Sequence, residues 1–126
     1  MNVKKIAITI DDYNGLDSTV SGHFGHCTSF IIATISEGEI IEMVNVANPA
    51  HSSCDEPVNR LVGCGVNILI TMGIGMRPYM ATREAGLTVI QSNGGTVQGA
   101  INDYINGQSE LMNQEGICRG GNPHNQ

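Results

Sequence analysis

The order of the apolar runs along the chain constrains its fold more than any other feature of the sequence. Lys5 to Ile10 alternates, with an isoleucine at every second position, and Phe30 to Ile35 and Glu39 to Val46 are two further runs rich in β-branched residues. The segment SEGE lies between the last two runs, and its Gly38 can take the positive φ that a hairpin turn requires. We therefore predict a three-stranded meander at the start of the chain.

The pattern then changes to alternating helices and strands. Ser53 and Glu56 fit a capping box, which predicts a helix whose apolar stripe is Val58, Leu61 and Val62. The other predicted elements are a strand over Val66–Thr71, a helix over Arg77–Ala85, a strand over Leu87–Ile90, and a helix that Thr96 caps and Gly107 ends. The expected order is β-β-β-α-β-α-β-α, an α/β fold in which helices cover a mixed five-stranded sheet.

The length of 126 residues fits a single domain. We place this domain at residues 1–112. Residues 113–126 are polar and glycine-rich, with too little apolar surface to fold alone, so we expect a flexible C-terminal tail.

The net charge disfavours two classes of partner. The chain carries a formal charge of −6 and only six Lys and Arg residues, whereas nucleic acids and anionic membranes are bound chiefly by neutralising phosphates. The apolar run near the N-terminus is too short for a signal peptide. We expect a cytoplasmic protein that binds neither nucleic acid nor membrane.

Nitrogen and sulfur donors gather in two loops. The stretch VSGHFGHC supplies His23, His26 and Cys27, and HSSC supplies His51 and Cys54. Imidazole and thiolate are the usual ligands of soft and borderline metals, so a plain zinc or copper site is one hypothesis. The spacings match no common zinc motif, and local hydrogen-bonding roles in surface loops are the alternative.

Two glycine turns provide a different capacity. Gly73, Ile74 and Gly75 form one turn, Asn93 to Thr96 form the other, and each precedes a predicted helix. Such turns direct free N–H groups at whatever lies at the carboxyl ends of the strands, which favours an anion. The alternative is that βα turns simply need glycine.

A hydrolase is the second hypothesis for this end of the sheet. Asp11, Asp12 and Asp17 follow the first predicted strand, and a meander followed by helices also describes the ribonuclease H-like topology. Asp11 or Asp12 would then hold a divalent ion. The acidic composition and the lack of an acidic residue on the fourth predicted strand count against it.

Four segments together resemble a known family. They are similar to the dinitrogenase iron-molybdenum cofactor biosynthesis family, the NifX-like domains that also form the C-terminal part of NifB proteins. The segments are VSGHFGHCTSFIIATI, NVANP with His51, VNILITMGIGMRPYMATREAGLTVI and NGGTVQGAINDYINGQ. The resemblance spans Ile6 to Gln108. It implies a ribonuclease H-like three-layer fold that binds or carries an iron-molybdenum cluster and catalyses no reaction. The orange protein of sulfate-reducing bacteria, which holds a molybdenum-copper sulfide cluster, is similar.

The resemblance also assigns residues to the site. It implies that His23, within the HFG motif of His23, Phe24 and Gly25, contacts the cluster. The supporting backbone would come from Gly73, Ile74, Gly75, Gly94, Gly95 and Thr96. Further candidate metal ligands are His51, His26 and Cys27. The implied partners are cluster-assembly or acceptor proteins, and nothing carries over to Cys118 or His124.

Overall fold

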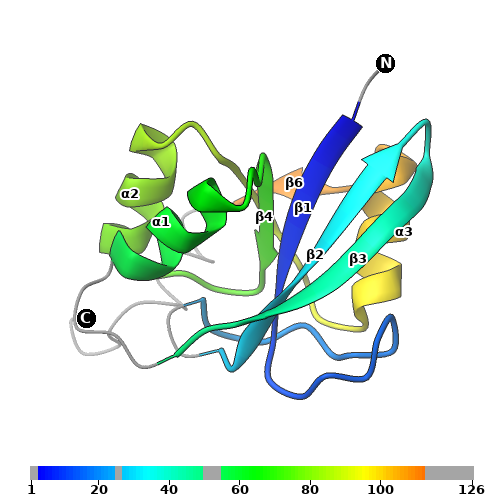
Figure 1. Ribbon diagram of the computed structural model, residues 1–126, viewed down its shortest axis with the longest axis horizontal. Coiled ribbons are helices and arrows are strands. Elements are labelled where there is room, and N and C mark those ends of the chain that lie inside the picture. The colour runs from blue at the N-terminus through cyan, green and yellow to red at the C-terminus, as the bar shows by residue number, and fades with distance from the viewer. Residues whose placement is uncertain (1–2, 25–26, 50–54, 113–126) are drawn as a thin grey trace.

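A six-stranded mixed sheet forms the centre of the protein. The structure, a computed structural model, describes residues 3–24, 27–49 and 55–112 (Figure 1). The strands are β1 (Val3–Ile10), β2 (Ser29–Ser36), β3 (Glu39–Ala47), β4 (Ile68–Thr71), β5 (Thr88–Gln91) and β6 (Glu110–Leu111), and the helices are α1 (Asp55–Gly63), α2 (Met76–Glu84) and α3 (Val97–Ile105). Across the sheet the strands run in the order β3-β2-β1-β4-β5-β6.

The central strand, β1, belongs to both halves of the sheet. Ile8 pairs with Ile31 of antiparallel β2 and with Ile70 of parallel β4. The predicted meander is confirmed, because β2 and β3 also pair antiparallel. Their turn places Gly38 at a φ of 80°, as predicted, and Glu37 at 54°, so both residues adopt the left-handed conformation that matches strand twist.

Helices cover both faces of the sheet (Figure 1). The isoleucines of β1 share one apolar cluster with α3, which includes Ile6, Ile8, Ile10, Val97 and Ile101. The opposite face packs against α1 and α2 through a cluster that includes Ala7, Leu69, Val58, Leu61 and Ile74. Because β1 is covered from both sides, Ile6 to Ile10 are all buried, and the alternation in its sequence separates two cores rather than core from solvent.

Two expectations about elements were wrong. The sheet has a sixth strand, because Glu110 and Leu111 of β6 pair with the end of β5. A two-residue strand whose Leu111 is 68% exposed has no periodicity to detect. Val62, placed in the apolar stripe of α1, is 44% exposed, because the helix is buried mainly through Val58 and Leu61.

The ends of the helices agree with the local signals. The Thr96 side chain accepts a hydrogen bond from the Gly99 amide at 3.2 Å, which is the predicted N-cap of α3. Helix α2 ends before Gly86, whose φ is 85°. Ser53 of the predicted capping box and the tail from residue 113 lie outside the described residues. Within the described ranges, no helix is long and apolar enough to cross a membrane.

Candidate functional site

The loop that leaves β1, residues 11–24, is hydrogen-bonded to both glycine turns. The Phe24 amide donates to the Gly73 carbonyl at 3.0 Å, and the Val20 amide donates to the Gly95 carbonyl at 3.0 Å. The Met72 amide also reaches the Ser21 carbonyl at 3.4 Å. The topology therefore brings the β1 loop, the first glycine turn (73–75) and the second glycine turn (93–96) together at one end of the sheet, as the sequence predicts.

A pair of buried threonines fixes this junction. Thr9 near the end of β1 and Thr71 at the end of β4 are both fully buried, with their hydroxyl oxygens 3.0 Å apart. The Thr71 hydroxyl donates to the Gly73 carbonyl at 3.1 Å, and the Thr9 hydroxyl lies 3.3 Å from the Ser21 carbonyl that it can donate to. The first glycine turn and the β1 loop are thus tied to adjacent strand ends, a role for threonine that the sequence did not indicate.

The glycine turns keep several backbone N–H groups available. Within the described part of the chain, the amides of Gly73, Ile74, Gly75, Gly95 and Thr96 donate to no protein group. The Gly94 amide differs, because it donates to the Ser92 hydroxyl at 3.1 Å. Gly73 and Ile74 are buried, whereas Gly75 is half-buried and Gly95 and Thr96 are exposed, so only the last three have surface at which an amide could meet a ligand. The remaining amides form the kind of N–H cradle that binds anions.

His23 lies exposed beside this cradle. Its amide donates to the Ser21 hydroxyl oxygen at 3.3 Å, and that hydroxyl lies 3.2 Å from Asp11 Oδ1, to which it can donate. The bond to Ser21 holds the His23 backbone on one side. On the other side the next residue, Phe24, is bonded to Gly73. An exposed imidazole at this position is accessible to a metal-containing ligand.

Two neighbours of His23 point into the core instead. Phe24 is buried against Phe30, with ring centroids 5.7 Å apart. Cys27 is 3% exposed, and its thiol donates to the Phe24 carbonyl at 3.2 Å. Burial raises the pKa of the Cys27 thiol to about 12. A neutral, enclosed thiol is a poor metal ligand, so this geometry disfavours the predicted ligand role of Cys27.

Neither the zinc or copper site nor the carboxylate site of a hydrolase is formed among residues 3–24, 27–49 and 55–112. No group of three or more His, Cys, Asp or Glu side chains in these ranges could hold a metal ion. The carboxylates considered for a hydrolase, Asp11, Asp12 and Asp17, are exposed at the surface of the β1 loop. The remaining predicted ligands and motif residues, Gly25, His26, His51 and Cys54, lie outside the described residues.

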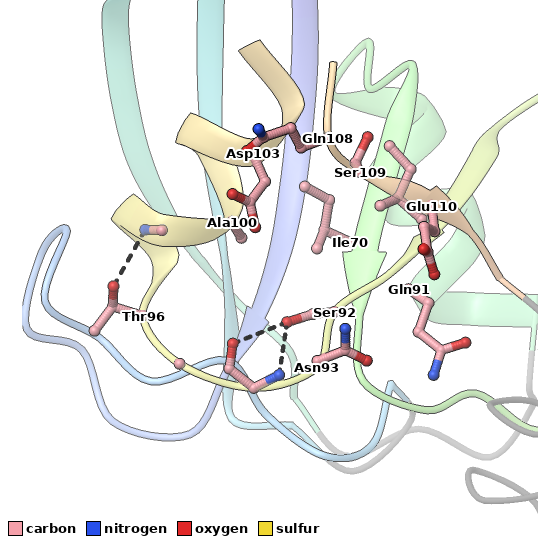
Figure 2. A pocket seen from close by; sticks show the side chains of 14 residues that line it. Ile70, Gln91, Ser92, Asn93, Thr96, Ala100, Asp103, Gln108, Ser109 and Glu110 are labelled. Atoms are coloured by element: carbon pink, nitrogen blue, oxygen red, sulfur yellow. Dashed lines mark hydrogen bonds between the residues drawn. The ribbon is translucent and has the colours of Figure 1, made fainter. Parts of the chain in front are cut away.

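A cavity of about 480 Å³ lies on the other side of the second glycine turn, between β5, β6 and α3 (Figure 2). Gly94, Gly95 and Thr96 form part of its wall. Its lining includes no described residue of the β1 loop or of the first glycine turn, so it is not a hollow shared by His23 and both turns. Asp103 and Glu110, which the sequence analysis did not single out, also line it. These carboxylates would repel an anion.

The family follows from a sequence comparison. The family model described as dinitrogenase iron-molybdenum cofactor matches residues 4–107, which is most of the chain. The chain belongs to this family. The resemblance inferred from the HFG motif and the glycine turns is thereby confirmed. The matched residues include the β1 loop, both glycine turns and α3.

Individual relatives support the same grouping. A NifB-like protein from Thermotoga, solved by NMR, is 32% identical, with 90% of this chain and 99% of that chain aligned at a TM-score of 0.72. An uncharacterized protein of Methanocaldococcus jannaschii is 28% identical over 114 residues, which cover 87% of this chain and 92% of the relative. The apo orange protein of Desulfovibrio gigas shares the fold, with a TM-score of 0.76 at 24% identity over 86% of this chain and 92% of that chain.

Proposed function

We propose that this protein binds an iron-molybdenum cluster, or a related molybdenum-, iron- or copper-sulfide cluster, as cargo. In this proposal it works in the cytoplasm as a carrier or store, delivers the cluster to assembly or acceptor proteins, and catalyses no reaction of its own. Membership of the dinitrogenase iron-molybdenum cofactor family supports a cluster-related role. The cluster would lie at the β1 loop, against the first glycine turn and the near side of the second.

The observation that carries the proposal is the hydrogen bonding of the β1 loop to both glycine turns. The Phe24–Gly73 bond places the His23 backbone close to the first glycine turn, whose half-buried Gly75 has an amide with no acceptor among the described residues, and the Val20–Gly95 bond joins the same loop to the second turn. A sulfide-rich cluster is a bulky anion whose metals are mostly ligated internally. Such a cargo needs one or two side-chain ligands and several N–H donors to its sulfur atoms, and the chemistry of His23 and the turns fits that need.

Two carboxylates line the cavity, whereas one, Asp11, lies 3.2 Å from Ser21 Oγ on the side proposed for the cluster. Asp103 and Glu110 line the cavity, whereas the turn at 73–75 precedes α2, whose first turn carries no acidic residue. The N-terminus of α2 also contributes the positive end of its dipole. Local donors can therefore hold an anion even though the whole chain is acidic.

The fold assignment that accompanies this proposal is ribonuclease H-like. An antiparallel meander, β1 to β3, is extended by parallel β4 and β5, with helices on both faces, and this arrangement supports the assignment. Ribonuclease H-like enzymes place metal-binding carboxylates together. Because no such cluster occurs among the described residues, no observation favours the hydrolase hypothesis.

Anaerobic loading with a defined probe tests the proposal. The purified protein is mixed with tetrathiomolybdate and copper(I), or with tetrathiomolybdate and iron(II), and separated from free metal by gel filtration. We expect molybdenum to elute with the protein in a fixed ratio, with visible absorption, and His23→Ala to lower retention about tenfold, which is equivalent to about 1.4 kcal/mol of binding free energy.

The matched control is His124→Ala, which removes an imidazole from a part of the sequence to which the resemblance assigns no role. It should retain molybdenum as the wild type does. A wild-type protein that releases all molybdenum on the column would refute cargo binding. Equal retention by the two histidine variants would refute the assignment of His23.

A further inference from the structure

The cavity between α3, β5 and β6 has the construction of a second, chemically different binding site. Its volume of about 480 Å³ is within the usual range for small-molecule pockets. Ile70, Ile90 and Ala100 supply an apolar floor, and Figure 2 shows Ile70 projecting into the space between α3 and β6. Ile70 and Ile90 are already buried beneath the cavity, so the apolar surface of this floor that a ligand could remove from water is that of half-buried Ala100.

The polar groups around the floor select the charge of the ligand. Asp103 on α3 and Glu110 on β6 bring two carboxylates, and the described lining includes no Lys or Arg. The Asn93 and Gln108 side chains add amide oxygens that can accept hydrogen bonds (Figure 2). The carboxylates and amide oxygens therefore offer acceptors to a positively charged donor, while the Gly95 and Thr96 amides of the same wall offer N–H donors.

The same groups favour an organic cation over a metal ion. Divalent ions are held by several oxygen ligands with clustered carboxylates, and the described residues contain no group of three acidic, histidine or cysteine side chains suited to a metal. An ammonium group needs only a few acceptors, and its hydrocarbon part would use the apolar floor, which a bare ion would not.

We propose that this cavity binds a small organic ammonium ion, with its hydrocarbon part against Ala100 and its protonated amine facing Asp103 or Glu110. The site is separate from the one proposed for the cluster. The β1 loop lies on the opposite side of the second glycine turn from the cavity. It is held there by the Val20–Gly95 bond and by a bond of 2.8 Å from the Val97 amide to the Ser18 carbonyl. The proposal stands whether or not the protein carries a cluster.

Titration followed by two-dimensional ¹H–¹⁵N NMR tests the site with three probes of matched shape. Phenethylammonium is the cation, 2-phenylethanol is its neutral counterpart and 3-phenylpropionate is its anionic counterpart. We expect only the cation, at millimolar concentration, to shift the amide signals of Gly94, Gly99 and Ser109. The signals of Gly65 and Gly86, which do not line the cavity, should stay in place.

Two charge-removing variants identify the carboxylates. Asp103→Asn and Glu110→Gln should each weaken phenethylammonium binding about threefold to fivefold at low salt, because both side chains are exposed and their charges are partly screened. Glu84→Gln on α2, an exposed carboxylate that does not line the cavity, is the matched control and should leave binding unchanged. The dispersion of the NMR spectra reports the fold of each variant.

Three results would overturn the proposal. The first is an absence of shifts at the cavity with phenethylammonium. The second is equal shifts with the alcohol, which would remove the role of charge. The third is undiminished binding when both carboxylates are replaced.

Discussion

At the scale of single residues, burial gives His23 and Cys27 opposite chemistry although they are close in sequence. His23 is exposed, next to Phe24, whose amide is bonded to the first glycine turn. Cys27 is enclosed by the core, and its pKa is raised to about 12 by desolvation, which outweighs the hydrogen bond from Asn48. The two residue types are equally plausible metal ligands in the sequence. Only their packing separates an accessible donor from an inert thiol.

The raised pKa of Cys27 predicts a loss of stability in alkaline solution. The folded protein keeps the thiol protonated up to about pH 12, whereas the unfolded chain releases the proton near pH 9, so stability is complete below pH 9 and falls as the pH rises towards 12. Between pH 8 and 10 this group should cost about 1.4 kcal/mol of unfolding free energy, the equivalent of one pH unit. Urea unfolding at both values measures the loss.

Other groups titrate in the same range, so the comparison is made with a variant. Cys27→Ala should lose about 1.4 kcal/mol less than the wild type between pH 8 and 10, whatever its stability at pH 8. Cys64→Ala, which removes a half-buried thiol, is measured alongside as the cysteine control. An identical alkaline loss in Cys27→Ala and the wild type would contradict the assignment.

At the scale of elements, the Thr96 cap links the second glycine turn to α3. Thr96→Ala removes the acceptor for the Gly99 amide and should lower the unfolding free energy by about 1 kcal/mol. Thr19→Ala is the matched control, because Thr19 is an exposed threonine paired with Thr96 in an isolated bridge and caps no helix. Chemical unfolding of the three proteins measures the difference. Equal losses in both variants would show that the cap contributes nothing.

Elements with local causes were predictable from the sequence. The turn at Gly38, the cap at Thr96 and the helix stop at Gly86 depend on the conformational preferences of the residues that form them. Elements defined by tertiary contacts were not. β6 exists because β5 offers an edge to pair with, and Val62 is exposed because the core is reached by the neighbouring Val58 and Leu61.

At the scale of the whole molecule, topology explains which part of the candidate site the sequence could predict. The carboxyl ends of β1 and β4 lie side by side in a parallel pair, so the loops after them must meet, and the Phe24–Gly73 bond is the result. The cavity was missed because its wall includes Glu110 on β6, whose pairing no pattern indicates, and Asp103, an ordinary surface position in the helix sequence. The roles of the predicted site residues remain predictions.

The charge of the whole molecule predicts an unusual salt dependence for the proposed cluster site. A protein that holds an anion with lysines and arginines binds more weakly as salt increases. Here the proposed donors are backbone amides and one imidazole, while the chain carries a net charge of −6 that repels the anion from a distance. The screening length falls from about 30 Å at 0.01 M salt to about 8 Å at 0.15 M. Salt should therefore weaken the repulsion and leave the short-range contacts nearly intact.

We accordingly expect the apparent affinity for tetrathiomolybdate to rise about twofold to threefold between these two salt concentrations, a gain of less than 1 kcal/mol. Equilibrium dialysis under anaerobic conditions, with molybdenum measured on both sides of the membrane, gives the affinity directly. Asp103→Asn, which removes one distant negative charge, should raise the affinity at low salt and have little effect at high salt. A steep fall in affinity with salt would mean that basic side chains, rather than the glycine turns, hold the anion.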